Sequence, residues 1–287
     1  MGFKRIGFIG LGAMGFPMAK NLLKNDYELH VIAHRNREPV DELTAQGATE
    51  HKSVADIFSQ CDCIISILPT DKEMESVLLN QQVLDAINPD SVLIEMTSGS
   101  PEMMKKVHDA YQLKGIPVLD GPVSGGTIGA ENGTLTVMVG GDPDVLERTR
   151  PVLEAMAKNI YLVGSVGAGK AIKAINQMLA GIHMVASAEA VALAEKLEID
   201  MDKLKEVVGN SSGASWMLAN KMDGLVKRDF TPGFKLNLMK KDIQIAVNEG
   251  VDKQLPLANY VLELFKQSEK ESGEEDFSAI GKSSLST

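Results

Sequence analysis

Three glycines near the start of the chain constrain its fold more than any other feature. Gly10, Gly12 and Gly15 form a Gly-x-Gly-x-x-Gly pattern between an apolar run, Ile6–Ile9, and a helical pattern. In this setting the first glycine permits a tight turn, the second lets the backbone approach a pyrophosphate, and the third allows close packing of helix on strand. The helix N-terminus then faces the anion. The loop Gly10-Leu11-Gly12-Ala13-Met14-Gly15 therefore predicts a dinucleotide site, the alternative being a merely structural glycine turn.

The first half of the chain alternates short apolar runs with helical patterns. Strands are predicted at Ile6–Ile9, Glu28–Ala33, Cys63–Leu68, Val92–Glu95, Pro117–Leu119, Leu135–Val139 and Ile160–Val163. Helices are predicted at Met14–Lys24, Arg37–Gln46, Lys72–Leu79, Pro101–Leu113 and Pro143–Ala157. Such alternation indicates a parallel sheet that is covered by helices on both faces. The predicted fold class is therefore α/β, with an N-terminal doubly wound sheet of the Rossmann type.

The pattern changes after Gly164. A long helix is predicted from about Lys170 to Leu197, because apolar residues recur there at spacings of three and four. Downstream no strand is clear, and further helices are predicted at 203–208, 236–249 and 257–270. We therefore predict an NAD(P)-binding domain at 1–163 and an all-helical substrate and dimerisation domain at 164–287. The long helix is apolar over much of its circumference, which favours burial against a second subunit in a homodimer or homotetramer.

Composition narrows the partners and the compartment. The chain has 39 acidic and 29 basic residues, a formal net charge of −10, which argues against nucleic acid or an anionic membrane as the main partner. No uncharged apolar stretch reaches about 18 residues, so no membrane span is predicted. No signal-peptide pattern begins the chain, and Cys61 and Cys63 fall in a strand that is expected to be buried. These features predict a reducing, cytoplasmic location, and the five scattered histidines predict no metal site.

The end of the second predicted strand bears on the choice of cofactor. NAD-binding chains place a carboxylate there for the ribose 2′-hydroxyl, but this chain has His34-Arg35-Asn36. The guanidinium of Arg35 suits a 2′-phosphate, with His34 and Asn36 as neutral donors. We therefore favour NADP, with NAD as the alternative if Arg35 is only a solvated surface residue.

A second candidate site follows the strand that ends at Leu119. Ser124, Gly125 and Gly126 offer a hydroxyl and closely spaced backbone N–H groups beyond a strand end, where open α/β sheets bind their ligands. This arrangement suits a substrate carboxylate. By itself, the segment is equally consistent with a simple turn.

A third candidate lies in the first turns of the long helix. Asn176 and Gln177 follow Lys173 at i+3 and i+4, so the three side chains share a face. The positive helix end and partial desolvation both disfavour an ammonium and bring a lysine into the range for general acid–base catalysis. On spacing alone, a surface lysine fits better.

Taken together, these segments resemble the β-hydroxyacid dehydrogenase family, which includes 3-hydroxyisobutyrate dehydrogenases and tartronate semialdehyde reductases. The resemblance covers nearly the whole chain and rests on Ile6–Ala19, Asp120–Gly126 and Gly167–Gln177. The last segment matches Gly-x-Gly-x-x-x-Lys-x-x-Asn-Asn/Gln, with Lys173 at the family's catalytic lysine. Gln177 stands where many members have Asn and where the tartronate semialdehyde branch has Gln.

The resemblance implies roles for individual residues. Lys173 would exchange a proton with the substrate oxygen while the nicotinamide exchanges a hydride, and Ser124 to Gly126 would hold the substrate carboxylate. Substrate contacts would therefore be Ser124, Gly125, Gly126, Asn176 and Gln177. Further cofactor contacts would be Leu68, Pro69, Ser98 and Lys241. A family Asn after the Leu-Pro pair is Glu73 here, so we expect no cofactor contact at that position.

The predicted function is NAD(P)-dependent interconversion of a small 3-hydroxy acid and its aldehyde acid, with Lys173 as general acid and base. Two alternatives remain open. One is another enzyme on the same fold, either a reductase of another carbonyl or an imine, or a decarboxylating dehydrogenase of phosphosugar acids. The phosphogluconate enzymes are usually much longer, which counts against the decarboxylating dehydrogenase. The other is a non-catalytic dinucleotide-binding protein.

Overall fold

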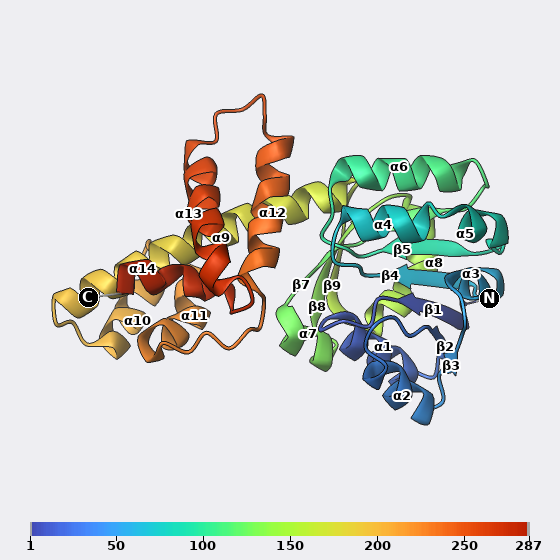
Figure 1. The fold of residues 1–287 in the computed structure, drawn as a ribbon, viewed down its shortest axis with the longest axis horizontal. Coiled ribbons are helices and arrows are strands. Elements are labelled where there is room, and N and C mark those ends of the chain that lie inside the picture. The colour runs from blue at the N-terminus through green and yellow to red at the C-terminus, as the bar shows by residue number, and fades with distance from the viewer. Residues whose placement is uncertain (1, 286–287) are drawn as a thin grey trace. The chain divides into compact units, whose positions relative to one another are not determined.

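The computed structural model describes residues 2–285, which form two compact units divided between Lys173 and Ala174. The first unit contains the sheet, and the second is helical (Figure 1). The boundary predicted from the sequence, between residues 163 and 164, precedes the long helix, whereas the division between the compact units falls inside that helix.

The first unit is built on a nine-stranded sheet with the order β3-β2-β1-β4-β5-β6-β8-β7, in which β9 pairs with β8. The strands from β3 to β6 are parallel, β8 is antiparallel to β6 and β7, and β9 is parallel to β8. The order 3-2-1-4-5-6 is that of a dinucleotide-binding doubly wound sheet, which confirms the predicted fold class. The strands are β1 (Arg5–Ile9), β2 (Glu28–Val31), β3 (Thr49–Glu50), β4 (Cys63–Ser66), β5 (Val92–Glu95), β6 (Val118–Asp120), β7 (Val123–Ser124), β8 (Leu135–Gly140) and β9 (Ala157–Gly164).

Helices cover both faces of this sheet because its strands are apolar on both sides (Figure 1). In β4, for example, Cys63 and Ile65 point into one core while Ile64 points into the other. The first core is closed by α1 (Gly15–Lys24), α2 (Glu38–Ala45), α7 (Gly126–Asn132) and α8 (Pro143–Glu154). The second is closed by α3 (Val54–Gln60), α4 (Asp71–Leu78), α5 (Gln81–Ala86) and α6 (Pro101–Gln112).

The second unit packs helices around the long helix α9 (Ala168–Lys196), as predicted, and no strand occurs among the described residues after β9. A Cβ on Gly181 of α9 would lie 2.5 Å from the Ile243 side chain, so the glycine allows close helix packing. Asp276 orders the loop before α12, since it pairs with Lys221 and accepts the N–H groups of Gly233 and Phe234. The remaining elements are α10 (Met201–Gly209), α11 (Trp216–Lys227), α12 (Leu236–Glu249), α13 (Pro256–Ser272), the 3₁₀ helix η1 (Phe277–Gly281) and α14 (Lys282–Leu285).

Two further features of the sequence can be compared with this packing. Cys61 and Cys63 are free and buried, and burial raises the pKa of the Cys61 thiol to about 12, so both act as small core residues. Helix α9 is long and apolar enough to cross a membrane by length and composition. However, 44% of its most apolar window is buried inside the structure, and the core helix of a globular protein passes the same test.

Candidate active site

The predicted site residues of the first unit follow neighbouring parallel strands. The strands β2, β1, β4, β5 and β6 lie side by side, so the segments after them succeed one another along one edge of the sheet. The fold therefore brings together, at the carboxyl ends of the strands, segments that are far apart in sequence. In spatial order these are His34–Asn36, Gly10–Gly15, Leu68–Pro69 and Ser98, whereas Ser124–Gly126 lies at the end of β7, which β8 separates from β6.

The three glycines of the loop differ in the space that surrounds them. Gly10 has a φ of 101°, and a Cβ there would lie 2.0 Å from the carbonyl oxygen of Ile67. A Cβ on Gly15 would lie 1.9 Å from the carbonyl oxygen of Gly10, whereas a Cβ on Gly12 would have no protein atom within 4 Å. The first turn of α1 has no acidic residue, and its N-cap residue, Met14, accepts no N–H with its side chain. The open space at Gly12 and the uncapped helix end fit a pyrophosphate.

This difference leads to a paired prediction. Gly12→Ala is expected to leave the midpoint of thermal unfolding nearly unchanged, because the methyl group enters open space, and to raise the dinucleotide Kd roughly tenfold or more, about 1.4 kcal/mol. Gly15→Ala, the matched variant, is expected to lower the unfolding midpoint without any ligand. Differential scanning fluorimetry and a fluorescence titration with NADPH measure both effects. Unchanged affinity in Gly12→Ala would place the pyrophosphate elsewhere.

Arg35 is exposed just after β2, as are His34 and Asn36. The neighbouring Arg37 is held by Glu50 and Asp41, with each N–O distance 3.0 Å. The Asn36 side chain accepts the N–H of Glu38 at 3.1 Å, which orders the turn into α2. Within the described residues no acidic side chain pairs with Arg35, whereas two pair with Arg37.

The predicted carboxylate cradle is a glycine turn between β7 and α7. Gly125 and Gly126 have φ values of 134° and 63°, which side-chain-bearing residues rarely adopt, and both residues are exposed. Ser124 pairs with Thr136 of β8 and is half-buried. The turn thus leaves backbone N–H groups at the surface beside the Ser124 hydroxyl, an arrangement that suits an anionic group.

The loops after β4 and β5 are tied together. The N–H of Leu68 donates to the Thr97 hydroxyl at 2.8 Å, and the N–H of Ser100 donates to the Asp71 carboxylate at 2.9 Å. These bonds hold Leu68 and Ser98 on adjacent loops. Glu73, where the family has Asn, accepts the Thr70 hydroxyl, which lowers the pKa of the Glu73 carboxyl.

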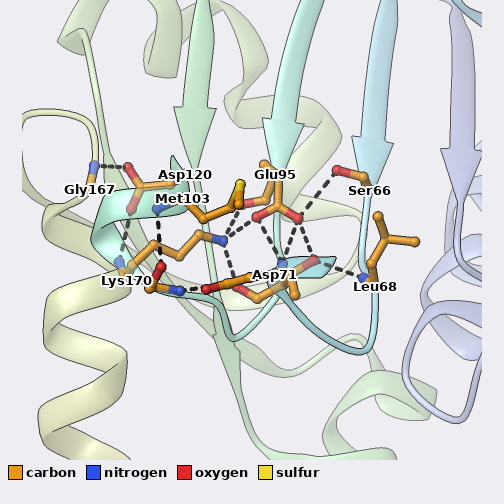
Figure 2. A network of polar contacts seen from close by, with 10 residues as sticks. Ser66, Leu68, Asp71, Glu95, Met103, Asp120, Gly167 and Lys170 are labelled. Carbon is orange, nitrogen blue, oxygen red and sulfur yellow. Dashed lines mark hydrogen bonds and ion pairs between the residues drawn. The ribbon is translucent and has the colours of Figure 1, made fainter. Parts of the chain in front are cut away.

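A buried polar network joins these loops to α9 (Figure 2). The side chains of Glu95, at the end of β5, and Lys170, in the first turn of α9, are both fully buried and form an ion pair. The Lys170 ammonium also donates to the backbone carbonyls of Glu95, at 3.2 Å, and Thr97. The Glu95 carboxylate accepts the Thr97 N–H and, at 3.4 Å, the Ser66 hydroxyl. Every charge in the network therefore has partners.

Asp120, at the end of β6, caps α9 from a distant part of the chain. Its carboxylate accepts the N–H of Gly167 at 2.7 Å and that of Lys170 at 2.9 Å. Burial raises the pKa of Asp120, while the Lys170 charge and these two bonds oppose that rise. Sequence reasoning assigned no role to Glu95, Asp120 or Lys170. The sequence does contain a signal for them: Glu95 and Asp120 each end an apolar strand, and a buried carboxylate requires a partner.

Lys173 lies one turn after Lys170 and is only 7% exposed. Farther along α9, in the second unit, the Gln177 amide donates to Asp242 at 2.8 Å and accepts from the Asn176 amide at 3.0 Å. The Lys241 ammonium lies 2.9 Å from the other Asp242 oxygen. Gln177 and Lys241 thus both contact the buried Asp242, and Asn176 is linked to it through Gln177. Asp242 is not among the predicted site residues.

Metal chemistry requires a ligand cluster. Among the described residues, no three His, Cys, Asp or Glu side chains gather as candidate ligands. Ring nitrogens of His30 and His51 lie 2.8 Å apart, but these two residues form only a pair and not a cluster of three. The residues that the fold does bring together are donors for anions and a buried lysine.

Comparison with known proteins agrees with this geometry. Residues 5–164 match the model of the NAD-binding domain of 6-phosphogluconate dehydrogenase, and residues 167–283 match the NAD-binding model of NADP-dependent 3-hydroxyisobutyrate dehydrogenase. An NAD-dependent L-serine dehydrogenase of Pseudomonas aeruginosa is 39% identical, with 97% of each chain covered. A 3-hydroxyisobutyrate dehydrogenase of the same organism is 37% identical, with 96% of this chain and 97% of that protein covered.

The solved structures give the same assignment. A Mycobacterium tuberculosis 3-hydroxyisobutyrate dehydrogenase with L-serine superimposes with a TM-score of 0.90, at 32% identity and 99% coverage of both chains. Fold, glycine loop and full-length similarity therefore agree. The chain belongs to the β-hydroxyacid dehydrogenase family of NAD(P)-dependent oxidoreductases.

Proposed function

We propose that the protein catalyses the reversible oxidation of a small 3-hydroxy acid to its aldehyde acid, with Lys173 as general acid and base. The observation that supports this role is the position of Lys173 on α9. It is only 7% exposed and lies one turn after Lys170, near the start of the helix. It also stands at the position of the family's catalytic lysine in the segment Gly167–Gln177, so it is our candidate for proton exchange with a substrate.

Each residue of the site has a chemical task in this proposal. The dinucleotide, when bound, supplies hydride acceptance or donation. Lys173 takes the hydroxyl proton during oxidation and returns it to the carbonyl oxygen during reduction. The Ser124 hydroxyl and the N–H groups of Gly125 and Gly126 hold the substrate carboxylate, while Asn176 and Gln177 orient the reacting oxygen. Most of the rate enhancement would come from positioning and proton transfer.

The substrate class is proposed from shared chemistry. The names of two relatives specify L-serine and 3-hydroxyisobutyrate. Both compounds have a primary hydroxyl group and a carboxylate that is two carbons away, and they differ in the substituent on the carbon between. A carboxylate cradle and one proton-exchanging lysine serve either compound.

A substrate panel with both NAD and NADP tests the proposal. It contains 3-hydroxyisobutyrate, L-serine and glycerate as hydroxy acids, and tartronate semialdehyde, succinic semialdehyde and glyoxylate for reduction. We expect turnover of hydroxy acids of the shared type and none of their amides, which lack the carboxylate. Turnover of cyclic imines alone would support the imine reductase alternative, and cofactor binding without any turnover would support the non-catalytic one.

We propose NADP as the preferred cofactor, because Arg35 is exposed beyond β2 and Arg37 is engaged by two carboxylates. NAD remains the alternative, and the L-serine dehydrogenase relative is NAD-dependent by name. The cytoplasmic location also stays a prediction.

We further propose that the protein is a homodimer or homotetramer that assembles through α9. Ile172, Ile175 and Leu179 share a face of this helix and are 41–50% exposed. Leu179→Lys places a charge on that apolar surface and is expected to shift the molar mass from light scattering to that of one chain. Lys196→Met, at the exposed end of the same helix, serves as the control. An oligomer that survives Leu179→Lys would contradict this assembly surface.

A further inference from the structure

We propose that Lys170 is a positioning residue, whose buried ammonium fixes the first turn of α9 against the carboxyl end of β5 and thereby sets the place of Lys173. The inference rests on the proposed function, because it takes Lys173 as the proton-exchanging group. It assigns Lys170 no contact with substrate or cofactor.

The contacts of the Lys170 side chain fix its position. It is fully buried, and its ammonium reaches three acceptors, namely the Glu95 carboxylate and the carbonyls of Glu95 and Thr97. An ammonium has three donors, so each has a partner. Lys170 is therefore a fixed link between two elements that are 75 residues apart.

The pair of Lys170 and Glu95 also connects α9 to the loops after β4 and β5. Glu95 bonds the Ser66 hydroxyl and the Thr97 hydroxyl, and Thr97 in turn bonds the N–H of Leu68. Thus the loops after β4 and β5, with the predicted cofactor contacts Leu68 and Ser98, belong to the same network. Figure 2 shows Lys170 reaching these strand ends from the helix.

Asp120 attaches the first turn of α9 to the sheet at a second point. Asp120 caps α9 through the N–H groups of Gly167 and Lys170, and Asp120 begins the segment that contains the carboxylate cradle. A Cβ on Gly169 would lie 2.6 Å from the Asp120 carboxylate, so only glycine allows this approach. Lys173 is three residues beyond Lys170, about 4.5 Å along the helix axis. A shift of this turn therefore moves Lys173 relative to both sets of predicted contacts.

A role in stability and a role in positioning predict different results when both members of the pair are replaced. Removing both members of a buried ion pair and leaving apolar or neutral groups is often neutral or stabilising, whereas removing one member leaves an uncompensated buried charge. A network that served only stability would be dispensable as a pair. A network that positions Lys173 would not be.

The test compares Lys170→Met, Glu95→Gln and the double variant Lys170→Met/Glu95→Gln with Lys105→Met, which removes an exposed lysine of α6. Thermal unfolding, the NADPH Kd, and kcat and KM for the best hydroxy acid are measured for each. We expect Lys170→Met to unfold at a lower temperature and the double variant to recover most of that loss. We expect both to lose at least tenfold in kcat, with the NADPH Kd changed less than threefold. Lys105→Met should match the parent.

The double variant decides the question even where Lys170→Met does not fold, because it removes both charges of the pair, while Asp120 keeps its two backbone N–H donors. A folded double variant with the parent's kcat would overturn the positioning role and leave the role of Lys173 intact. A Lys173→Met variant with full activity would instead overturn the proposed function, and with it this inference. The two failures are therefore distinguishable.

Discussion

Replacing Lys173 by methionine is expected to lower kcat/KM for the hydroxy acid by a factor of about 10²–10⁴, the usual contribution of a positioned acid–base group. The side chain is 7% exposed, and methionine preserves its length and apolar stem, so the helix should tolerate the change. Because the variant lacks the group that accepts the hydroxyl proton, the loss should appear in kcat. Steady-state kinetics in both reaction directions, together with a dinucleotide titration, measure it.

The control for this variant is Lys105→Met, on the exposed face of α6. It removes the same charge without touching the site and should keep the parent's kinetics. If Lys173→Met binds the dinucleotide normally and turns over every substrate as the parent does, another group exchanges the proton. Loss of dinucleotide binding together with activity would instead indicate that Lys173 holds the cofactor, which contradicts the acid–base assignment.

Replacing Arg35 by aspartate is expected to shift the ratio of kcat/KM for NADP to that for NAD by about 10²-fold towards NAD. A charged hydrogen bond contributes about 1.5–3 kcal/mol, which corresponds to roughly 10–150-fold. Arg35 is exposed beyond β2. The substitution removes a hydrogen-bond donor that suits a 2′-phosphate and introduces an acceptor that suits a 2′-hydroxyl. Saturation kinetics with each cofactor at a fixed substrate concentration give the ratio.

Arg37→Gln is the matched control, because Arg37 lies two residues away and is held by Glu50 and Asp41. Its loss removes surface ion pairs, which contribute little to stability, and should leave the cofactor ratio unchanged. The 2′-phosphate assignment fails if Arg35→Asp keeps the parent's ratio, or if Arg37→Gln changes it as strongly.

Local signals in the sequence were sufficient for the fold class and for the glycine loop at Gly10–Gly15. The period of apolar residues located the long helix and most of the strands, because it reflects which side chains meet a core. The short elements β3 and β7, with two residues each, carry too few residues to show a period. Helix α3 was also missed, although Ser53 and Asp56 form a capping box at its start. This capping box is a local signal that the sequence contains.

The chemical environment of the site depended on contacts across the chain. The sequence by itself determined the glycine loop, since the strand, the Gly-x-Gly-x-x-Gly turn and the helix are contiguous in the chain. It also placed Lys173, Asn176 and Gln177 on one helix. Only the tertiary structure decided that Glu95 pairs with Lys170 and that Gln177 bonds Asp242, 75 and 65 residues away. The reason is physical: the period of a helix or strand is a property of neighbouring residues, whereas the partner of a buried charge is set by which strand ends and helix turns the sheet order brings together.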